Sequence, residues 1–194
     1  MAGTFFLVVG ASGVGKDTLL TGAKLLLAED RRFLFARREI TRPSEAGGED
    51  HICTSPEEFA RRRDAGGFFI HWSAHGFDYG LSATLAHELA RGRNVVANGS
   101  RETIADIAGR VENFVVIEIT AASDTIAQRL SARGREAASA IAARRRRATP
   151  PFPPDVEVVR IGNDADPESG AERLVAVLLA HATCEGPLIP IPKT

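Results

Sequence analysis

The sequence has little of what assigns a chain to a secreted or membrane compartment. Its 194 residues include two cysteines, Cys53 and Cys184, which lie far apart and form neither a disulfide framework nor a metal-ligand spacing. The longest apolar runs, at 5–9 and 174–180, are far shorter than the roughly 18 residues that a membrane-spanning helix needs. No basic segment precedes the first apolar run, as it would in a signal peptide. These absences predict no membrane partner, reduced thiols and a cytoplasmic location.

Neither sign of charge is in excess. The chain has 24 Lys and Arg residues against 25 Asp and Glu, so its formal net charge is −1. Proteins that coat nucleic acid need an excess of positive charge, so we expect no nucleic-acid partner. With 44% hydrophobic and 25% charged residues, the composition is that of an ordinary folded protein of about one domain. The oligomeric state is left open.

Strand-like apolar runs alternate with helical repeats along the chain. Strands are predicted at 5–9, 33–40, 68–72, 94–97, 114–119 and 156–161. Helices are predicted at 18–28, 56–64, 82–91, 123–132, 136–148 and 168–182, the second of them with Ser55 and Glu58 at capping-box spacing. This alternation predicts an α/β fold whose parallel sheet is covered by helices on both faces.

A glycine-rich loop joins the first predicted strand to the first predicted helix. It has the pattern GxxxxGK, formed by Gly10, Ala11, Ser12, Gly13, Val14, Gly15 and Lys16. In this setting the backbone N–H groups and the helix N-terminus converge on nucleotide phosphates, and the lysine places its charge on the β and γ phosphates. The loop therefore predicts a nucleotide-binding site.

The residue after the loop lysine is unusual. This position normally carries a Ser or Thr whose hydroxyl binds Mg²⁺, but here it is Asp17, and Thr18 completes the predicted nucleotide-binding set. A carboxylate that faces phosphates repels them unless a cation lies between, so one interpretation makes Asp17 a ligand of Mg²⁺. The alternative is that Asp17 only favours the helix N-terminus through the helix dipole.

Further motifs make the chain resemble the guanylate kinase-like branch of P-loop kinases from about residue 5 to 182. They are GASGVGKDTLL at 10–20, ITRP at 40–43, GEDHICTSPEEF at 48–59, GFFIHW at 67–72, GFDYG at 76–80, RLSARGRE at 129–136 and IGND at 161–164. A closer likeness is to the ribose 1,5-bisphosphate phosphokinases, whose patterns GKD, NGSR and RGRExxSxI stand here at 15–17, 98–101 and 133–141.

The resemblance implies a fold and a reaction. The implied fold is an α/β three-layer sandwich of the P-loop kinase type, with a mostly parallel central sheet, a small acceptor-binding insertion at about 33–92 and a helical lid at about 129–148. It would form one domain over 1–185, followed by a tail at 186–194. The implied reaction transfers the γ-phosphoryl group of ATP, with Mg²⁺, to the 1-phosphate of ribose 1,5-bisphosphate, giving 5-phosphoribosyl 1-diphosphate and ADP in phosphonate catabolism. The partner is then a small sugar phosphate.

Several positions depart from guanylate kinase. Of the two tyrosines and two arginines that hold its acceptor phosphate, the second tyrosine and one arginine match Tyr79 and Arg42, whereas His51 and Glu45 stand at the other positions. His71 stands where a glutamate reads the guanine base. Because a carboxylate accepts from the N–H donors of guanine, its loss leaves that edge of the base unread.

The acidic pair expected after the central strand is also missing. Asn98 and Ser100 stand there instead. The resemblance places them at the acceptor, and their neutral donors and acceptors suit a substrate that is rich in hydroxyls and has no base. Asn163, after the last strand, is implied to contact adenine, although an Asn-Asp turn explains it equally well.

The catalytic charge is assigned to three basic residues. Lys16 and the lid residues Arg133 and Arg144 would spread positive charge over the transferred phosphoryl group. Arg144 begins a run of four arginines at 144–147, most of which would lie on a solvated helix face.

The acceptor is assigned to a second set of residues. Arg38 and Arg42 are four residues apart and share a face if their segment stays extended, and Arg101 follows the central strand at the edge where ligands of α/β sheets collect. Arg101 would hold a second substrate phosphate. Tyr79 and His51 are either substrate contacts or structural groups.

Two other functions stay open. A guanylate-type nucleoside monophosphate kinase shares the scaffold but is disfavoured by His51, His71, Asn98 and Ser100. A non-catalytic interaction domain on the same scaffold is disfavoured by the intact Lys16 loop, because a binding module has no use for transition-state charge.

Overall fold

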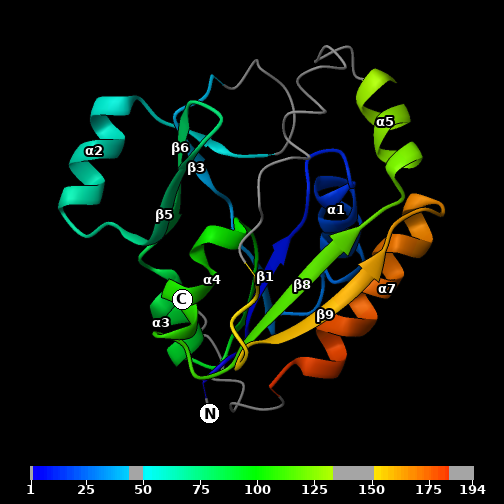
Figure 1. Cartoon of the computed structure of the whole chain (residues 1–194). Helices are drawn as coiled ribbons and strands as arrows, with labels where there is room; N and C mark the ends of the chain where they lie inside the picture. The colour runs from blue at the N-terminus through cyan, green and yellow to red at the C-terminus, as the bar shows by residue number, and fades with distance from the viewer. Residues whose placement is uncertain (1, 44–49, 133–150, 184–194) are drawn as a thin grey trace.

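A five-stranded parallel sheet runs through the middle of the molecule (Figure 1). The structure is a computed structural model, and it describes residues 2–43, 50–132 and 151–183. Across the sheet the strands are β2 (Phe33–Phe35), β7 (Asn94–Asn98), β1 (Phe5–Val9), β8 (Phe114–Thr120) and β9 (Glu157–Gly162). All four pairings are parallel, so the carboxyl ends of the strands meet at one edge.

Strand β1 forms the centre of the core because every one of its residues is apolar and buried. It pairs with β7 on one side and with β8 on the other. The register places Val8 opposite Asn98 and Val9 opposite Glu118. The loop that follows Val9 therefore begins between the ends of two strands that both carry polar side chains.

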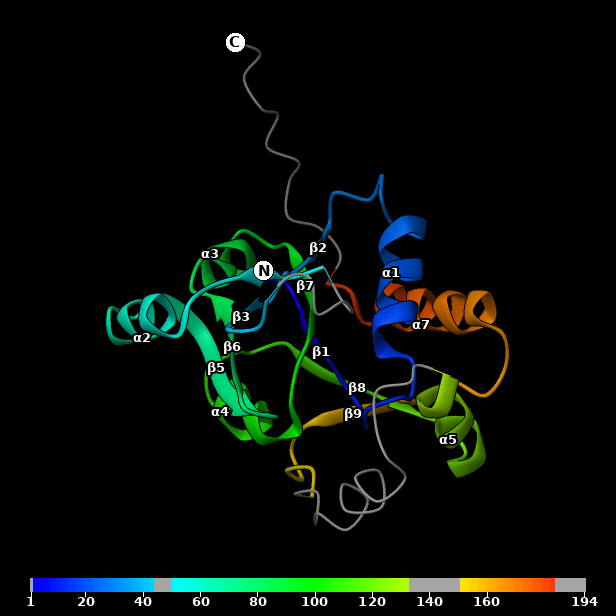
Figure 2. The ribbon, with the colours of Figure 1, turned by 90° about the horizontal axis from the view of Figure 1, so that it is seen from above.

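Helices cover both faces of this sheet (Figure 2). On one face α1 (Lys16–Leu26) packs against α7 (Pro167–His181), and a Cβ placed on Gly22 would lie only 2.6 Å from that of Ala171. On the other face lie α3 (Leu85–Ala90) and α4 (Ile104–Ala108). The remaining helix of the described chain, besides α2 below, is α5 (Ser123–Ala132), which follows β8. This arrangement confirms the predicted three-layer α/β fold.

A second sheet stands beside the first, on the side of α3 and α4 (Figures 1 and 2). Its strands lie in the order β4 (Ile52–Cys53), β3 (Glu39–Ile40), β6 (Phe77–Ser82) and β5 (Phe68–Ala74). Strands β5 and β6 form an antiparallel hairpin, which turns at His75 and Gly76, both with positive φ. This sheet and α2 (Pro56–Asp64) make up most of the region predicted as an acceptor-binding insertion.

The prediction of a single strand over 33–40 is wrong. Phe33–Phe35 pairs with β7 in the large sheet, whereas Glu39–Ile40 pairs with β4 and β6 in the small one. The chain leaves one sheet and enters the other between them. Arg38 and Arg42 lie on either side of the two-residue strand β3, so no single strand contains both. The predicted helix at 82–91 is shorter, beginning at Leu85. The predicted helix at 136–148 lies outside the described residues, and the extent of the domain and lid stays a prediction.

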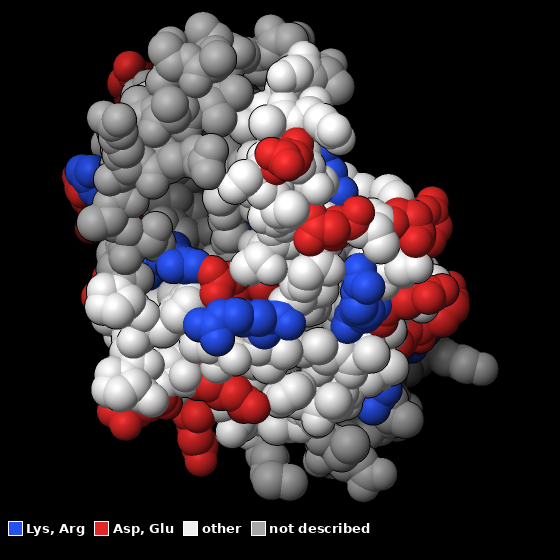
Figure 3. All heavy atoms as spheres, turned by 45° about the vertical axis from the view of Figure 1, so that its right-hand side comes forward, with Lys and Arg blue, Asp and Glu red and all other residues white. Residues whose placement is uncertain are grey.

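The described residues bear on a membrane or nucleic-acid partner in two ways. No helix within 2–43, 50–132 or 151–183 is both long and apolar enough to cross a membrane. On the face shown in Figure 3, basic and acidic side chains lie interspersed and do not gather into an area of one sign. The absence of a nucleic-acid partner stays a prediction.

Helix α2 is held against the small sheet by a partly buried ion pair and an aromatic stack. The Ser55 side chain accepts the Glu58 N–H at 3.1 Å, which confirms the predicted cap. The Phe59 ring stacks on Phe68 with centroids 4.5 Å apart. Arg62 pairs with Glu39, whose carboxylate is 3% exposed. Because Glu39 belongs to β3, this pair ties the helix to the strand that precedes Arg42.

Removing the cation of that pair is expected to destabilise the fold. Arg62→Ala should lower the free energy of unfolding by about 1–3 kcal/mol, because the buried Glu39 carboxylate loses its partner. Arg61→Ala removes only an exposed pair with Glu58 and should change it by less than about 0.5 kcal/mol. Chemical denaturation of both variants measures the difference. Equal small losses would show that Arg62 does not anchor α2.

Candidate functional site

The glycine-rich loop takes a backbone path that depends on its glycines, as Gly10 and Gly15 show. Gly10 has φ +152° and Gly15 has φ +96°, values that residues with a side chain rarely adopt. A Cβ on Gly10 would lie 2.4 Å from the carbonyl oxygen of Ile119, and one on Gly15 would lie 2.4 Å from Asn163 Nδ2. The loop therefore lies directly on β8 and on the segment that follows β9.

Two side chains from outside the loop hold its backbone in place. Asn163, 2% exposed, donates from Nδ2 to the Val14 carbonyl at 2.7 Å, and Arg129 of α5 donates to the same oxygen at 3.2 Å. In the structure the amide nitrogen of Asn163 is hydrogen-bonded to the loop. Its contact with adenine stays a prediction. Sequence reasoning missed this supporting contact, because the two residues are 149 positions apart.

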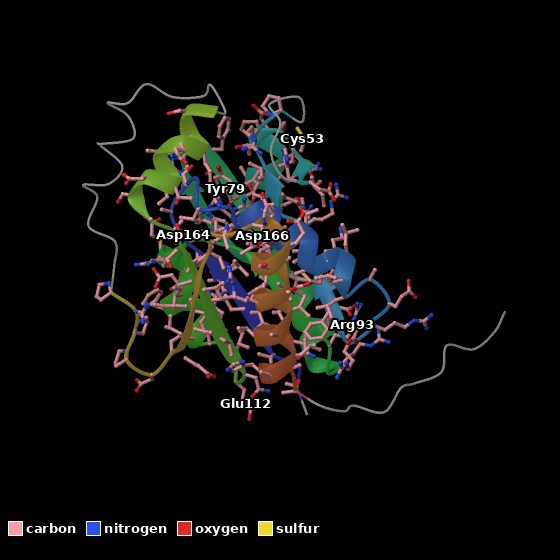
Figure 4. The ribbon with its side chains drawn as sticks, turned by 90° about the vertical axis from the view of Figure 1, so that its right-hand side faces the viewer. Cys53, Tyr79, Arg93, Glu112, Asp164 and Asp166 are labelled. Atoms are coloured by element: carbon pink, nitrogen blue, oxygen red, sulfur yellow. The ribbon has the colours of Figure 1, made fainter. Side chains whose placement is uncertain are left out.

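The neighbouring aspartate fixes the start of α5. The Ala122 N–H donates to Asp164 at 2.7 Å, and this bond, followed by one from Thr125 and the charge of Arg129, lowers the pKa of Asp164. Asp166 caps α7 by accepting the Ser169 N–H. In the view of Figure 4 both aspartates lie nearer to Tyr79 than to Glu112.

Lys16 begins α1 and reaches back over the loop. Its Nζ donates to the Gly10 carbonyl at 2.8 Å and to the Ala11 carbonyl at 3.2 Å. These contacts keep the ammonium group beside the loop and the N-terminus of an eleven-residue helix. Both features favour an anion, so this end of the sheet is suited to phosphate.

Asp17 and Asn98 meet at the same edge. Asn98 Nδ2 donates to an Asp17 oxygen at 2.8 Å. Asn98 is 5% exposed, and its Oδ1 is buried with no hydrogen-bond partner in the structure. A carboxylate and an unpartnered amide oxygen fit a hard cation such as Mg²⁺, which prefers oxygen ligands. No group of three His, Cys, Asp or Glu side chains that could hold a metal ion is found among the described residues, here included, so water and phosphate would complete the coordination.

An arginine stacks on two aromatic rings in the small sheet. The Trp72 and Tyr79 rings stack with centroids 5.4 Å apart and planes 7° apart. The Arg38 guanidinium lies 5.1 Å from the Tyr79 ring centroid and 5.9 Å from that of Trp72. The Tyr79 ring is part of the core, which agrees with the structural role that the sequence left open for it. The same ring also fixes Arg38.

Arg42 has unused hydrogen-bonding capacity in a buried position. Its Nε and Nη2 are buried and have no hydrogen-bond partner in the structure. His51, 9% exposed, contacts the Arg42 carbonyl oxygen at 3.2 Å through Nε2, so it steadies the backbone there. A guanidinium with two unsatisfied N–H groups is suited to an oxyanion. His71, in contrast, is exposed on β5.

The residues after β7 turn toward β8. Ser100 accepts the Glu102 N–H at 3.3 Å and starts a short 3₁₀ helix, Arg101–Thr103. Arg101 forms an ion pair with Glu118, which is 7% exposed on β8. Sequence reasoning missed Glu118; the available signal was a single acidic residue within an otherwise apolar strand that ends at the site.

The structure thus brings some predicted residues together. Lys16, Asp17 and Asn98 lie at one edge of the sheet, whereas Thr18 is exposed on the first turn of α1. Arg133 and Arg144 lie outside the described residues.

Two relatives decide the family. The ribose 1,5-bisphosphate phosphokinase PhnN of Brucella melitensis is 46% identical over 142 residues, which are 73% of this chain and 74% of that protein. The protein of the same name from Thiobacillus denitrificans is 40% identical over 176 residues, which are 91% of this chain and 93% of its own length. The chain belongs to the ribose 1,5-bisphosphate phosphokinase family. This confirms the resemblance carried by its motifs, although no family model matches the chain.

Longer proteins also match. The bifunctional ribose 1,5-bisphosphokinase-thymidine phosphorylase of Azorhizobium caulinodans is 53% identical over 93% of this chain, which spans about a quarter (26%) of that protein's length. Among solved structures, guanylate kinase from Anaplasma phagocytophilum has a TM-score of 0.64 at 20% identity, covering 92% of this chain and 86% of its own. An unliganded sugar kinase from Janibacter sp. HTCC2649 has a TM-score of 0.52 at 18% identity, covering 93% and 98%. These two likenesses show the shared fold.

Asn163→Ala separates support of the loop from contact with adenine. It should raise the dissociation constants of ATP and of inorganic tripolyphosphate by about fivefold to tenfold, because both ligands need the ordered loop that one hydrogen bond helps to hold. Asn113→Ala is the matched control, since Asn113 Nδ2 also makes one bond to a carbonyl, that of Ala2 at 2.9 Å, but does not contact the loop. Titration calorimetry measures both ligands. Weaker binding of ATP with unchanged binding of tripolyphosphate would indicate that Asn163 contacts adenine.

Proposed function

We propose that the chain transfers the γ-phosphoryl group of ATP to the 1-phosphate of ribose 1,5-bisphosphate, giving 5-phosphoribosyl 1-diphosphate and ADP in phosphonate catabolism. The observation that carries the proposal is that two buried nitrogen atoms of the Arg42 guanidinium, Nε and Nη2, have no acceptor, and that Arg42 closely follows β3 of the small sheet. The names of the family members support it. The small sugar-phosphate partner and a cytoplasmic location belong to the same proposal.

The phosphate loop would bind the donor. Backbone N–H groups of the loop and the N-terminus of α1 would hold the ATP phosphates, and Lys16 would exchange its two carbonyl partners for phosphate oxygens. Asp17 and Asn98 would hold Mg²⁺, which neutralises charge on the phosphates when it is bound. Because phosphoryl transfer depends mainly on positioning and positive charge, Arg133 and Arg144 are proposed to add theirs from the lid.

The small sheet would bind the acceptor. Arg42 offers two donors to one phosphate, and Arg38, fixed on the Trp72–Tyr79 stack, adds a second charge. His51 steadies Arg42 through its carbonyl. The guanylate-type alternative is not favoured, because the exposed imidazole of His71 stands where that family needs a carboxylate.

Product identification tests the function. Phosphorus NMR should show a diphosphate ester and ADP from ATP and ribose 1,5-bisphosphate, and no GDP from ATP and GMP. Formation of GDP would instead support the guanylate-type hypothesis.

Lys16→Ala tests the role of the phosphate loop. It should lower turnover at least about a hundredfold while circular dichroism stays unchanged, because the lysine charge acts on the phosphates and not in the core. Near-normal turnover of this variant would contradict the proposed role of the loop.

A magnesium titration tests Asp17. Asp17→Asn keeps the size but loses the charge, so it should raise the Mg²⁺ concentration needed for half-maximal activity and for tight ATP binding in calorimetry, with partial rescue by excess metal. Asp17→Ser should retain more activity than Asp17→Ala, because a hydroxyl serves this position in related loops. Curves that overlap with wild type would leave only the helix-terminus role of Asp17.

A further inference from the structure

A buried carboxylate holds two arginines at the edge of the sheet. Glu118, near the end of β8, pairs through Oε1 with Arg101 and through Oε2 with Arg160 Nε, the latter at 3.0 Å. The Glu118 side chain is 10% exposed, that of Arg101 is 23% exposed and that of Arg160 is 65% exposed. Both carboxylate oxygens are therefore occupied, while Arg160 reaches the surface.

An aromatic ring fixes the same two arginines. The guanidinium carbon of Arg101 lies 4.4 Å from the centroid of the Phe152 ring, and that of Arg160 lies 5.9 Å from it. Such contacts restrict the side chains and leave the donor edges of a guanidinium usable. The arginines are thus held in place before any ligand arrives, which lowers the entropy lost on binding.

The cluster carries an excess of one positive charge. It holds two guanidinium groups against one carboxylate. Because both guanidinium groups lie on one carboxylate, the two cations repel each other; burial, and next the charge of Arg160, lowers the pKa of Arg101 from its usual value. A second anion would offset that repulsion and accept from the N–H groups that Glu118 does not use.

The cluster lies between the phosphate loop and the small sheet. Side chains alternate along β8: Ile117 and Ile119 belong to the core cluster with α1 and α7, and Val116 belongs to the one with Trp72 and Tyr79. Glu118 shares the face of Val116 and stands opposite Val9, the last residue before the loop. The short helix that carries Arg101 also packs against β5.

We propose that Arg101 and Arg160 bind the phosphate of the acceptor that does not receive the transferred group, with Glu118 and Phe152 as positioning residues. This inference rests on the proposed function, because a bisphosphate carries an anion at each end of its sugar. Arg42 and Arg38 serve one end. The cluster gives the other end its own cationic site, and so selects a bisphosphate over a sugar monophosphate.

Two acceptors test this site: ribose 1,5-bisphosphate and ribose 1-phosphate, which lacks the second anion. Arg160→Ala should raise the KM for the bisphosphate at least about threefold and leave that for ribose 1-phosphate and ATP unchanged. Arg101→Ala, combined with Glu118→Gln so that no buried carboxylate is left unpaired, should raise the KM for the bisphosphate about tenfold to hundredfold. Arg31→Ala, an exposed arginine after α1, is the control for lost charge.

The outcomes separate the inference from the function. If wild type phosphorylates the bisphosphate but the variants raise the KM for both acceptors equally, the cluster has only a structural role. The inference is then overturned while the function stands. An effect of Arg31→Ala as large as that of Arg160→Ala would reduce the site to general electrostatic attraction, which also overturns it. If wild type turns over neither acceptor, the function itself fails before any variant is needed.

Discussion

The double pairing of β1 is the constraint on which the site depends. Because β1 is hydrogen-bonded to β7 and β8 in parallel registers, Val8 stands beside Asn98 and Val9 beside Glu118, and the loop starts between them. A shift of one residue in either pairing would turn a polar side chain at the edge into the core and an apolar one into the site. The free-energy cost of placing the Asn98 amide or the Glu118 carboxylate among apolar side chains opposes such a shift.

Around this edge, buried polar groups do the positioning. Asn163 holds the loop from below, Glu118 orients two arginines, and Glu39 ties α2 to the strand before Arg42. Each is nearly inaccessible to water and each has a defined partner, so its geometry is fixed by the fold. These buried groups thereby hold in place the residues that are proposed to bind substrate, without binding it themselves.

Local pattern was enough to predict the strand–loop–helix unit, the Ser55 cap and the three-layer fold, because each depends on neighbours in sequence. It failed where distant pairing decides. The run at 33–40 looks like one strand but divides between two sheets, and Asn163 reads as a turn although it supports a loop 149 residues away. Glu118 stands out as a charge among apolar neighbours, but its two arginine partners lie on other elements of the fold, which a local pattern does not reveal. Arg133 and Arg144 lie outside the described residues, so their roles stay predictions.

The contact between Asp17 and Asn98 also restricts how such a chain can evolve. Kinases with this loop usually place a hydroxyl on the loop and a carboxylate on the neighbouring strand, whereas here the carboxylate is on the loop and an amide on the strand. One substitution cannot convert either arrangement into the other. The intermediate sequence has two facing carboxylates, which repel each other, or none, which would leave the proposed Mg²⁺ without an anionic ligand. Positions 17 and 98 are therefore expected to covary, changing together or not at all.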